Sequence, residues 1–344
     1  MSRPTDRPVR VLQSVPEPRP TTNPYVVQLL DGLRASREVD VRTFSWPRAL
    51  GWRYDVLHVH WPENLLTGNG RARTAVRQLL FALLLLRSAA RRTVWVRTVH
   101  NLRPQERRTG LTAALLRRAE ARTSLHVWLN DRTPAVDGVP GVVVRHGHYR
   151  DWFAEHPARP PARGRLAFVG LIRPYKDVPG LLAAFADVPA DATLRLHVAG
   201  APRTPDLADL VRRAAAADGR VTLTLRHLDD AELVAAVTEA ELVVLPYQEM
   251  HNSGAVLLAL SLDRPVLVPD NAVNADLAAE VGPGWVLRYR GPLTADTLTA
   301  AAAAAADTVG SGRPDLSRRE WVGAVDAHVA AYRAALAQRG APAG

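Results

Sequence analysis

Short apolar runs rich in β-branched residues alternate with helix-like segments along most of the chain, and this alternation most constrains the fold. Strands that alternate with helices favour a parallel sheet covered by helices on both faces. A proline-rich segment, 155–164, interrupts the alternation, which then restarts. The pattern predicts an α/β protein with two Rossmann-like, doubly wound domains, 1–154 and 165–316, and a C-terminal helix and tail, 317–344. Because ligands bind at the carboxyl ends of parallel strands, we expect the domains to face each other across a cleft.

Composition narrows the classes of function. The chain has no cysteine, which excludes disulfides, thiolate metal sites and a cysteine nucleophile. The N-terminus lacks the apolar core of a signal peptide, and the longest apolar run, 79–86, is far shorter than the roughly 20 residues that cross a bilayer, so we expect a cytoplasmic protein. The net charge of +10 indicates a polyanionic partner, unless it reflects only an arginine-rich surface. No nucleic-acid-binding motif is present, which favours an anionic membrane surface or a phosphorylated substrate over nucleic acid.

Lys176 is the only lysine among 44 basic residues. A chain that uses arginine wherever a solvated charge suffices is expected to keep a lysine where a compact ammonium must reach a phosphate. Gly170 directly follows the predicted strand 166–169, so that the backbone can approach a ligand closely, and Arg173 lies between Gly170 and Lys176. We interpret these residues as a diphosphate-binding loop, with an ordinary charged surface turn as the alternative.

A second candidate anion site follows the predicted strand 242–245. Asn252 or Ser253 can cap the next helix, and Gly254 in its first turn leaves space for a phosphate at the helix N-terminus. An ordinary helix cap is the alternative. Tyr247 and His251 belong to the same loop and are expected to line the cleft.

The first domain offers candidates for a general base. Glu63 follows the strand 54–61 and is the first choice, His100 ends the strand 93–100, and His58 and His60 are further candidates that could instead be hydrogen-bonded core residues. A base is needed if a sugar is transferred to a hydroxyl with inversion.

Three other side chains are expected at the cleft. Asn23 should cap a helix that begins at Pro24, after a loop long enough to line a site, and His60 lies at the end of its strand. His148 lies in the aromatic-rich segment 146–153, which is either a hinge or a structural plug. The sequence has no Asp-x-Asp motif and no metal-ligand cluster, so we expect no metal and no cofactor.

These stretches resemble a known family. The motifs at 170–176, 245–247, 252–254 and 264–267 resemble those of GT-B glycosyltransferases, whose fold consists of two Rossmann-like domains. More narrowly, the chain is similar from about residue 9 to 337 to the GDP-mannose-dependent glycolipid β-mannosyltransferases of xanthan-type exopolysaccharide assembly. The residues that carry this similarity are 22–25, 54–63, 96–102, 146–153 and 250–254.

The resemblance implies transfer of mannose from GDP-mannose, with inversion, to a polyprenyl-diphosphate-linked oligosaccharide by a peripheral enzyme at the inner face of the plasma membrane. Retaining GT-B families carry a Glu-x7-Glu pair, where this chain has His251 and Ala259. The arginine-bracketed segment 71–92 is a candidate contact with anionic lipid, unless it is an ordinary crossover helix. Three alternatives stay open: another sugar nucleotide as donor, a nucleotide-sugar epimerase, or a non-catalytic subunit that binds a nucleotide sugar or lipid.

Overall fold

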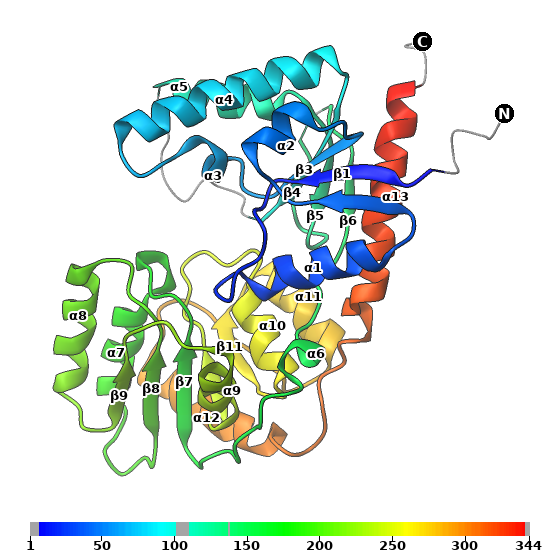
Figure 1. Cartoon of the computed structure of the whole chain (residues 1–344). Helices are drawn as coiled ribbons and strands as arrows, with labels where there is room; N and C mark the ends of the chain where they lie inside the picture. Colours follow the sequence, from blue (N-terminus) through cyan, green and yellow to red (C-terminus); the bar gives the residue numbers. More distant parts are fainter. Residues whose placement is uncertain (1–6, 101–109, 137, 341–344) are drawn as a thin grey trace. The chain divides into compact units, whose positions relative to one another are not determined.

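The computed structural model describes residues 7–100, 110–136 and 138–340. The chain forms two compact units (Figure 1). Unit 1 comprises Met1–Gly147 and Arg319–Gly344, and unit 2 comprises His148–Arg318. These boundaries differ from those expected at the linker 155–164 and at residue 317. The difference arises because the backbone N–H of Tyr149 already donates to Ser261 Oγ of unit 2 (2.8 Å), while the last helix packs on unit 1.

Unit 1 contains a six-stranded parallel sheet in the order β2-β1-β3-β4-β5-β6. In Figure 1, helices α2, α4 and α5 cover one face, and α1 and α13 the other. The strands are β1 Val9–Gln13, β2 Val39–Arg42, β3 Val56–Val59, β4 Val94–Val99, β5 Thr123–Trp128 and β6 Gly141–Val143. The helices are α1 Pro24–Ala35, α2 Trp46–Gly51, α3 Glu63–Leu66, α4 Arg71–Ala90, α5 Gly110–Glu120 and α13 Trp321–Gly340.

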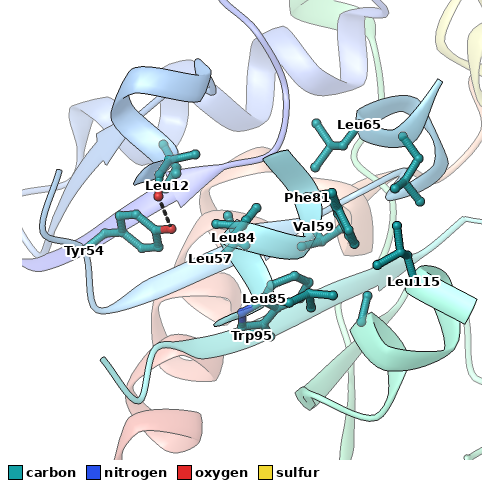
Figure 2. Packing of buried hydrophobic residues seen from close by; sticks show 13 residues of the cluster. Leu12, Tyr54, Leu57, Val59, Leu65, Phe81, Leu84, Leu85, Trp95 and Leu115 are labelled. Atoms are coloured by element: carbon teal, nitrogen blue, oxygen red, sulfur yellow. Dashed lines mark hydrogen bonds between the residues drawn. The ribbon is translucent and has the colours of Figure 1, made fainter. Parts of the chain in front are cut away.

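The helix predicted over 71–92 is confirmed as α4, and its inner face builds much of the core of unit 1. Phe81 and Leu84 are fully buried against Leu57 of β3 and Trp95 of β4 (Figure 2). The helix start at Asn23 is also confirmed, since its side chain accepts a hydrogen bond from the backbone N–H of Tyr25 (2.9 Å) and Pro24 opens α1.

Unit 2 contains a second six-stranded parallel sheet, ordered β12-β11-β10-β7-β8-β9. Helices α7, α8 and α12 form one layer, and α9, α10 and α11 cover the other face (Figure 1). The strands are β7 Arg165–Val169, β8 Arg195–Ala199, β9 Val221–Thr224, β10 Leu242–Val244, β11 Val266–Pro269 and β12 Val286–Tyr289. The helices are α6 Arg150–Phe153, α7 Val178–Ala186, α8 Pro205–Ala216, α9 Asp230–Thr238, α10 Gly254–Ser261, α11 Ala272–Val281 and α12 Ala295–Thr308, with 3-10 turns η1 Pro174–Lys176 and η2 Ser317–Arg319.

Each strand order reverses its direction of growth once, between β1 and β3 in unit 1 and between β7 and β10 in unit 2. At such a topological switch point the connections leave in opposite directions and open a crevice outside the carboxyl ends of the two strands. We therefore expect each unit to bind its ligand at the switch point of its sheet. In the described part of the chain, none of the helices combines the length and apolarity needed to span a bilayer.

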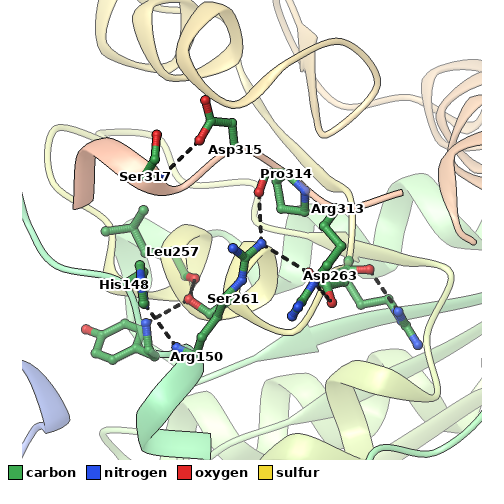
Figure 3. A network of polar contacts seen from close by, with 11 residues as sticks. His148, Arg150, Leu257, Ser261, Asp263, Arg313, Pro314, Asp315 and Ser317 are labelled. Atoms are coloured by element: carbon green, nitrogen blue, oxygen red, sulfur yellow. Dashed lines mark hydrogen bonds and ion pairs between the residues drawn. The ribbon is translucent and has the colours of Figure 1, made fainter. Parts of the chain in front are cut away.

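A polar network within unit 2 joins the two segments through which the chain enters and leaves it (Figure 3). The guanidinium of Arg150 donates to the carbonyl of Pro314 (2.8 Å) and pairs with Asp263 (3.3 Å), which also accepts from Arg313 (2.9 Å). The segments 148–153 and 313–317 are thus held together just beyond the C-terminal end of α10.

Candidate active site

The two anion-binding stretches predicted in the second domain lie side by side at the switch point of unit 2. Strands β7 and β10 are hydrogen-bonded neighbours, and the backbone N–H of Gln248, after β10, donates to the carbonyl of Tyr175 in η1 (2.8 Å). The structure therefore joins the Lys176 loop and the loop before α10 into one surface.

Glycines let the backbones at this edge approach closely. Gly170 has a φ of +109°, a conformation that glycine adopts without strain. A Cβ on Gly200, which follows β8, would lie only 1.9 Å from the carbonyl oxygen of Gly170. Sequence analysis did not single out Gly200, although its position directly after a strand was a signal.

Lys176 extends over an aromatic surface at this edge. Its Nζ lies 4.8 Å from the centroid of the Tyr247 ring, and 3.5 Å from where a Cβ on Gly170 would stand. Burial, reinforced by the nearby positive charge of Arg173, lowers the pKa of Lys176 to about 8. In the described part of the chain no carboxylate forms an ion pair with Lys176. A bound anion would stabilise the protonated form of Lys176 and raise its pKa.

The N-terminus of α10 lies beside this lysine loop. Ser253 is the capping residue, and its Oγ accepts from the backbone N–H of Val256 (3.4 Å), while Gly254 opens the helix. Of the two predicted caps, Asn252 is thus the residue before the cap. Burial lowers the pKa of His251 and raises that of Tyr247. The amides of the first turn and the helix dipole favour an anion at this point.

The histidines predicted in unit 1 form a hydrogen-bonded cluster at the other switch point, around the ends of β1, β3 and β4. His58 and His60 are buried and His100 is partly exposed. The ring nitrogens His60 Nδ1 and His100 Nε2 are 3.2 Å apart, and the indole of Trp61 stacks on His100 with a centroid distance of 4.1 Å. Burial lowers the pKa of all three histidines, in His60 to about 3, so they are neutral at neutral pH.

Glu63 is the first residue of α3 and is partly exposed. Its carboxylate interacts with Arg97 of β4. Burial lowers the pKa of Arg97, and the negative charge of Glu63 acts in the opposite direction. Arg97 also pairs with Glu120, which in turn contacts His126 Nε2 (2.9 Å). The carboxylate of Glu63 therefore faces a cation inside unit 1 and interacts with it electrostatically.

The remaining predicted residues lie in different settings. Asn23 is exposed at the start of α1. His148 is 3% exposed, and its Nδ1 accepts from the backbone N–H of Arg150 (3.2 Å), so it caps a turn in the network of Figure 3. Sequence analysis missed Gln13 and Tyr332, which complete the histidine cluster. Gln13 follows the apolar residues Val11 and Leu12 at the end of β1, but nothing in the sequence pairs it with Tyr332, 319 positions away.

The described residues contain no group of three or more histidine, aspartate or glutamate side chains that could hold a metal ion. Positive charge at the switch point of unit 2 comes from Arg173, Lys176 and the N-terminus of α10. This arrangement can hold a diphosphate, and unit 1 presents neutral imidazoles that can take up a proton.

Comparisons with known proteins give the family of the chain. Residues 163–307 match the family model of glycosyl transferases group 1. The chain is 43% identical over 332 residues to the GDP-mannose:glycolipid 4-beta-D-mannosyltransferase of Xanthomonas campestris pv. campestris, covering 96% of this chain and 94% of the relative.

Solved structures share the fold at low sequence identity. They include AviGT4, a glycosyltransferase involved in avilamycin A biosynthesis (16% identity, TM-score 0.57, 96% of this chain and 98% of that one). A trehalose-phosphate synthase from Burkholderia vietnamiensis is also similar (12% identity, TM-score 0.63, 98% and 100%). The predicted GT-B fold and glycosyltransferase class are confirmed, and the epimerase and non-catalytic interpretations are set aside. The chain belongs to the GT-B glycosyltransferases, in the family of the GDP-mannose:glycolipid 4-beta-D-mannosyltransferases.

Proposed function

We propose that this enzyme transfers mannose from GDP-mannose to a polyprenyl-diphosphate-linked oligosaccharide, with inversion to a β-mannoside, in exopolysaccharide assembly. The name of the Xanthomonas relative and the similarity over nearly the whole chain support the donor and the glycolipid acceptor. The observation that carries the proposal is Lys176, a partly buried cation with no ion-paired carboxylate among the described residues, placed at a switch point beside the N-terminus of α10.

Unit 2 is assigned the donor. Lys176, Arg173 and the first-turn amides of α10 hold the diphosphate, and Gly170 and Gly254 let it approach the backbone. As the bond between mannose C1 and the β-phosphate oxygen breaks, negative charge grows on the departing GDP. Cations and amides already in place stabilise that charge without reorganisation.

Unit 1 is assigned the proton transfer. The acceptor hydroxyl oxygen forms a bond to C1 on the side opposite the leaving GDP, and its proton passes to a base. His100 is the base that we favour, because its imidazole follows β4 directly and is partly exposed at the switch point of unit 1. Glu63, the other candidate, interacts with the guanidinium of Arg97.

A pair of variants tests this assignment. His100→Gln is expected to lower kcat of mannosyl transfer by about 10² to 10⁴, the usual contribution of a positioned base, and to leave the affinity for GDP unchanged. Glu63→Gln is the matched comparison and should keep most of the rate. Full activity in His100→Gln combined with loss of activity in Glu63→Gln would transfer the role to Glu63, and full activity in both would refute a base in this part of unit 1.

We also propose that α4 holds the enzyme at the anionic inner face of the plasma membrane. Val76, Leu79, Leu83 and Leu86 recur at helical spacing and form an exposed apolar stripe along α4, with Leu79 62% and Leu86 67% exposed. An apolar stripe of this kind on a helix with charged flanks is typical of a surface that lies in a lipid headgroup layer.

The arginines around this stripe divide into two groups. Arg77 donates to the backbone carbonyl of Asn64 in α3 (3.1 Å) and Arg87 to that of Leu50 in α2 (2.9 Å), so they support the packing of α4. The other arginines of the segment are exposed, and each can contribute about 1 kcal/mol near anionic lipid. They are Arg71, Arg73, Arg91 and Arg92.

Flotation with lipid vesicles tests the membrane proposal. The enzyme should float with vesicles that contain phosphatidylglycerol and much less with pure phosphatidylcholine vesicles. Leu79→Glu should abolish flotation, whereas Leu210→Glu, on exposed α8 of unit 2, serves as the control and should float normally. Equal flotation of the two variants would contradict the assignment of this surface.

A further inference from the structure

A line of buried polar side chains crosses the switch point of unit 1, and most of its members have no part in the transfer described above. Gln13 ends β1, His58 lies in β3 and Tyr332 comes from α13, and all three are fully buried. Buried polar groups are costly unless each finds a partner, so the hydrogen bonds among these groups determine which atoms carry protons.

The half of the line that leads to His100 fixes two tautomers. The side-chain oxygen of Gln13 lies 3.0 Å from Nε2 of His60, and an amide oxygen can only accept, so the proton of neutral His60 is on Nε2. His60 Nδ1 is then an acceptor. Because it lies 3.2 Å from Nε2 of His100, His100 donates from Nε2, and its lone pair is on Nδ1.

The other half runs from the amide nitrogen of Gln13 into the core. This nitrogen donates to the hydroxyl of Tyr332 (3.1 Å) and also lies 3.2 Å from Nδ1 of His58. Because an amide nitrogen can only donate, His58 Nδ1 is an acceptor, and the Tyr332 hydroxyl, 2.7 Å away, donates to it. His58 in turn donates from Nε2 to Thr98 Oγ1 (2.8 Å). Every hydrogen bond of the line therefore points the same way, from His100 toward Thr98.

Gln13 determines this direction. Imidazoles and hydroxyls can exchange donor and acceptor roles, but the oxygen and the NH₂ group of a primary amide cannot. We propose that Gln13 is a positioning residue that acts through His60 to hold His100 in the Nε2–H tautomer, so that Nδ1 is the atom that accepts the proton of the acceptor hydroxyl. The catalytic part of this inference rests on the proposed role of His100 as the base.

The tautomers themselves are measured by NMR on the full-length enzyme labelled with 15N-histidine, without substrate. The wild-type spectrum should show a protonated Nε2 and a pyridine-like Nδ1 in both His60 and His100. A pyrrole-like Nδ1 in His100 would overturn the proposal, and this result needs no variant and no activity.

Gln13→Leu and Tyr332→Phe both remove buried hydrogen bonds. Comparing them separates a positioning role of Gln13 from a general effect on packing. Gln13→Leu removes the group that accepts a hydrogen bond from His60, so both tautomers of His100 should be populated. We expect kcat to fall by about tenfold, which is part of the roughly 10² to 10⁴ that a base contributes. The KM for the donor should not change. Tyr332→Phe is the control. In this variant the side-chain nitrogen of Gln13 can still donate to His58 Nδ1, which lies 3.2 Å away in the wild-type structure. The direction of the hydrogen bonds and the His100 tautomer should therefore persist.

The outcomes distinguish this inference from the proposed function. The positioning role of Gln13 would be refuted if His100 had the same tautomer in wild type, Gln13→Leu and Tyr332→Phe. If Gln13→Leu does not fold, the spectra of the wild type and of Tyr332→Phe still decide the direction of the hydrogen bonds. Full transfer activity in His100→Gln would instead refute the base assignment and leave the tautomer result standing.

Discussion

Lys176 places a compact ammonium group at the candidate donor site. Its Nζ is close to both the Gly170 backbone and the Tyr247 ring. Lys176→Arg keeps the positive charge but replaces a compact group with a wide planar one. We expect the KM for GDP-mannose to rise about tenfold, a loss of about 1.4 kcal/mol in binding. An unchanged KM would show that any cation suffices and would contradict a specific need for lysine at this position.

The lowered pKa of Lys176 also predicts a pH dependence. A folded-state pKa of about 8 means that the free enzyme loses this charge as pH rises through 8, whereas the bound diphosphate favours the protonated form. The KM for the donor should therefore be flat below about pH 7.5 and rise about tenfold per pH unit above 8. In Lys176→Arg this rise should disappear, because arginine stays protonated in this range. Parallel curves for the two enzymes would assign the titration to another group.

At the scale of elements, the contact between the ends of β7 and β8 is expected to be the least tolerant position of the candidate donor site. A Cβ on Gly200 would collide with the Gly170 carbonyl, which cannot move without disturbing β7. We predict that Gly200→Ala lowers the free energy of unfolding by about 3 kcal/mol in a urea titration. Gly219→Ala is the control, since a Cβ there meets no atom within 4 Å. Similar stabilities of the two variants would contradict the close contact.

The elements also show how far the sequence could predict the structure. Alternating patterns predict both parallel sheets, because each strand and helix has its own local signal. The pattern around Trp321 and Tyr332 predicts a helix with a buried face, but periodicity does not identify which unit that face contacts. The hydrogen-bonded line through Gln13 and Tyr332 was therefore beyond prediction, as was the short helix α6, which belongs to unit 2 through contacts such as that of Tyr149 with Ser261. The residues of the candidate donor site were easier to find, because glycines and cations follow strands directly.

At the scale of the whole molecule, each unit has its candidate site at a switch point, and the character of the two candidate sites differs. The site of unit 2 is cationic and suits a diphosphate, whereas that of unit 1 consists of neutral, hydrogen-bonded imidazoles. This division matches the needs of sugar transfer, in which one partner leaves as an anion and the other gives up a proton. The exposed stripe on α4 belongs to unit 1, the unit assigned to the glycolipid acceptor.

The proposed reaction is the transfer of mannose from GDP-mannose to a lipid-linked glycan. It is tested most directly by incubating the purified enzyme with radiolabelled GDP-mannose and a polyprenyl-diphosphate-linked oligosaccharide, extracting the lipid fraction and digesting it with α- and β-mannosidases. We predict label in the lipid fraction that β-mannosidase releases and α-mannosidase does not. No transfer from GDP-mannose, together with transfer from a UDP-sugar to the same acceptor, would contradict the account.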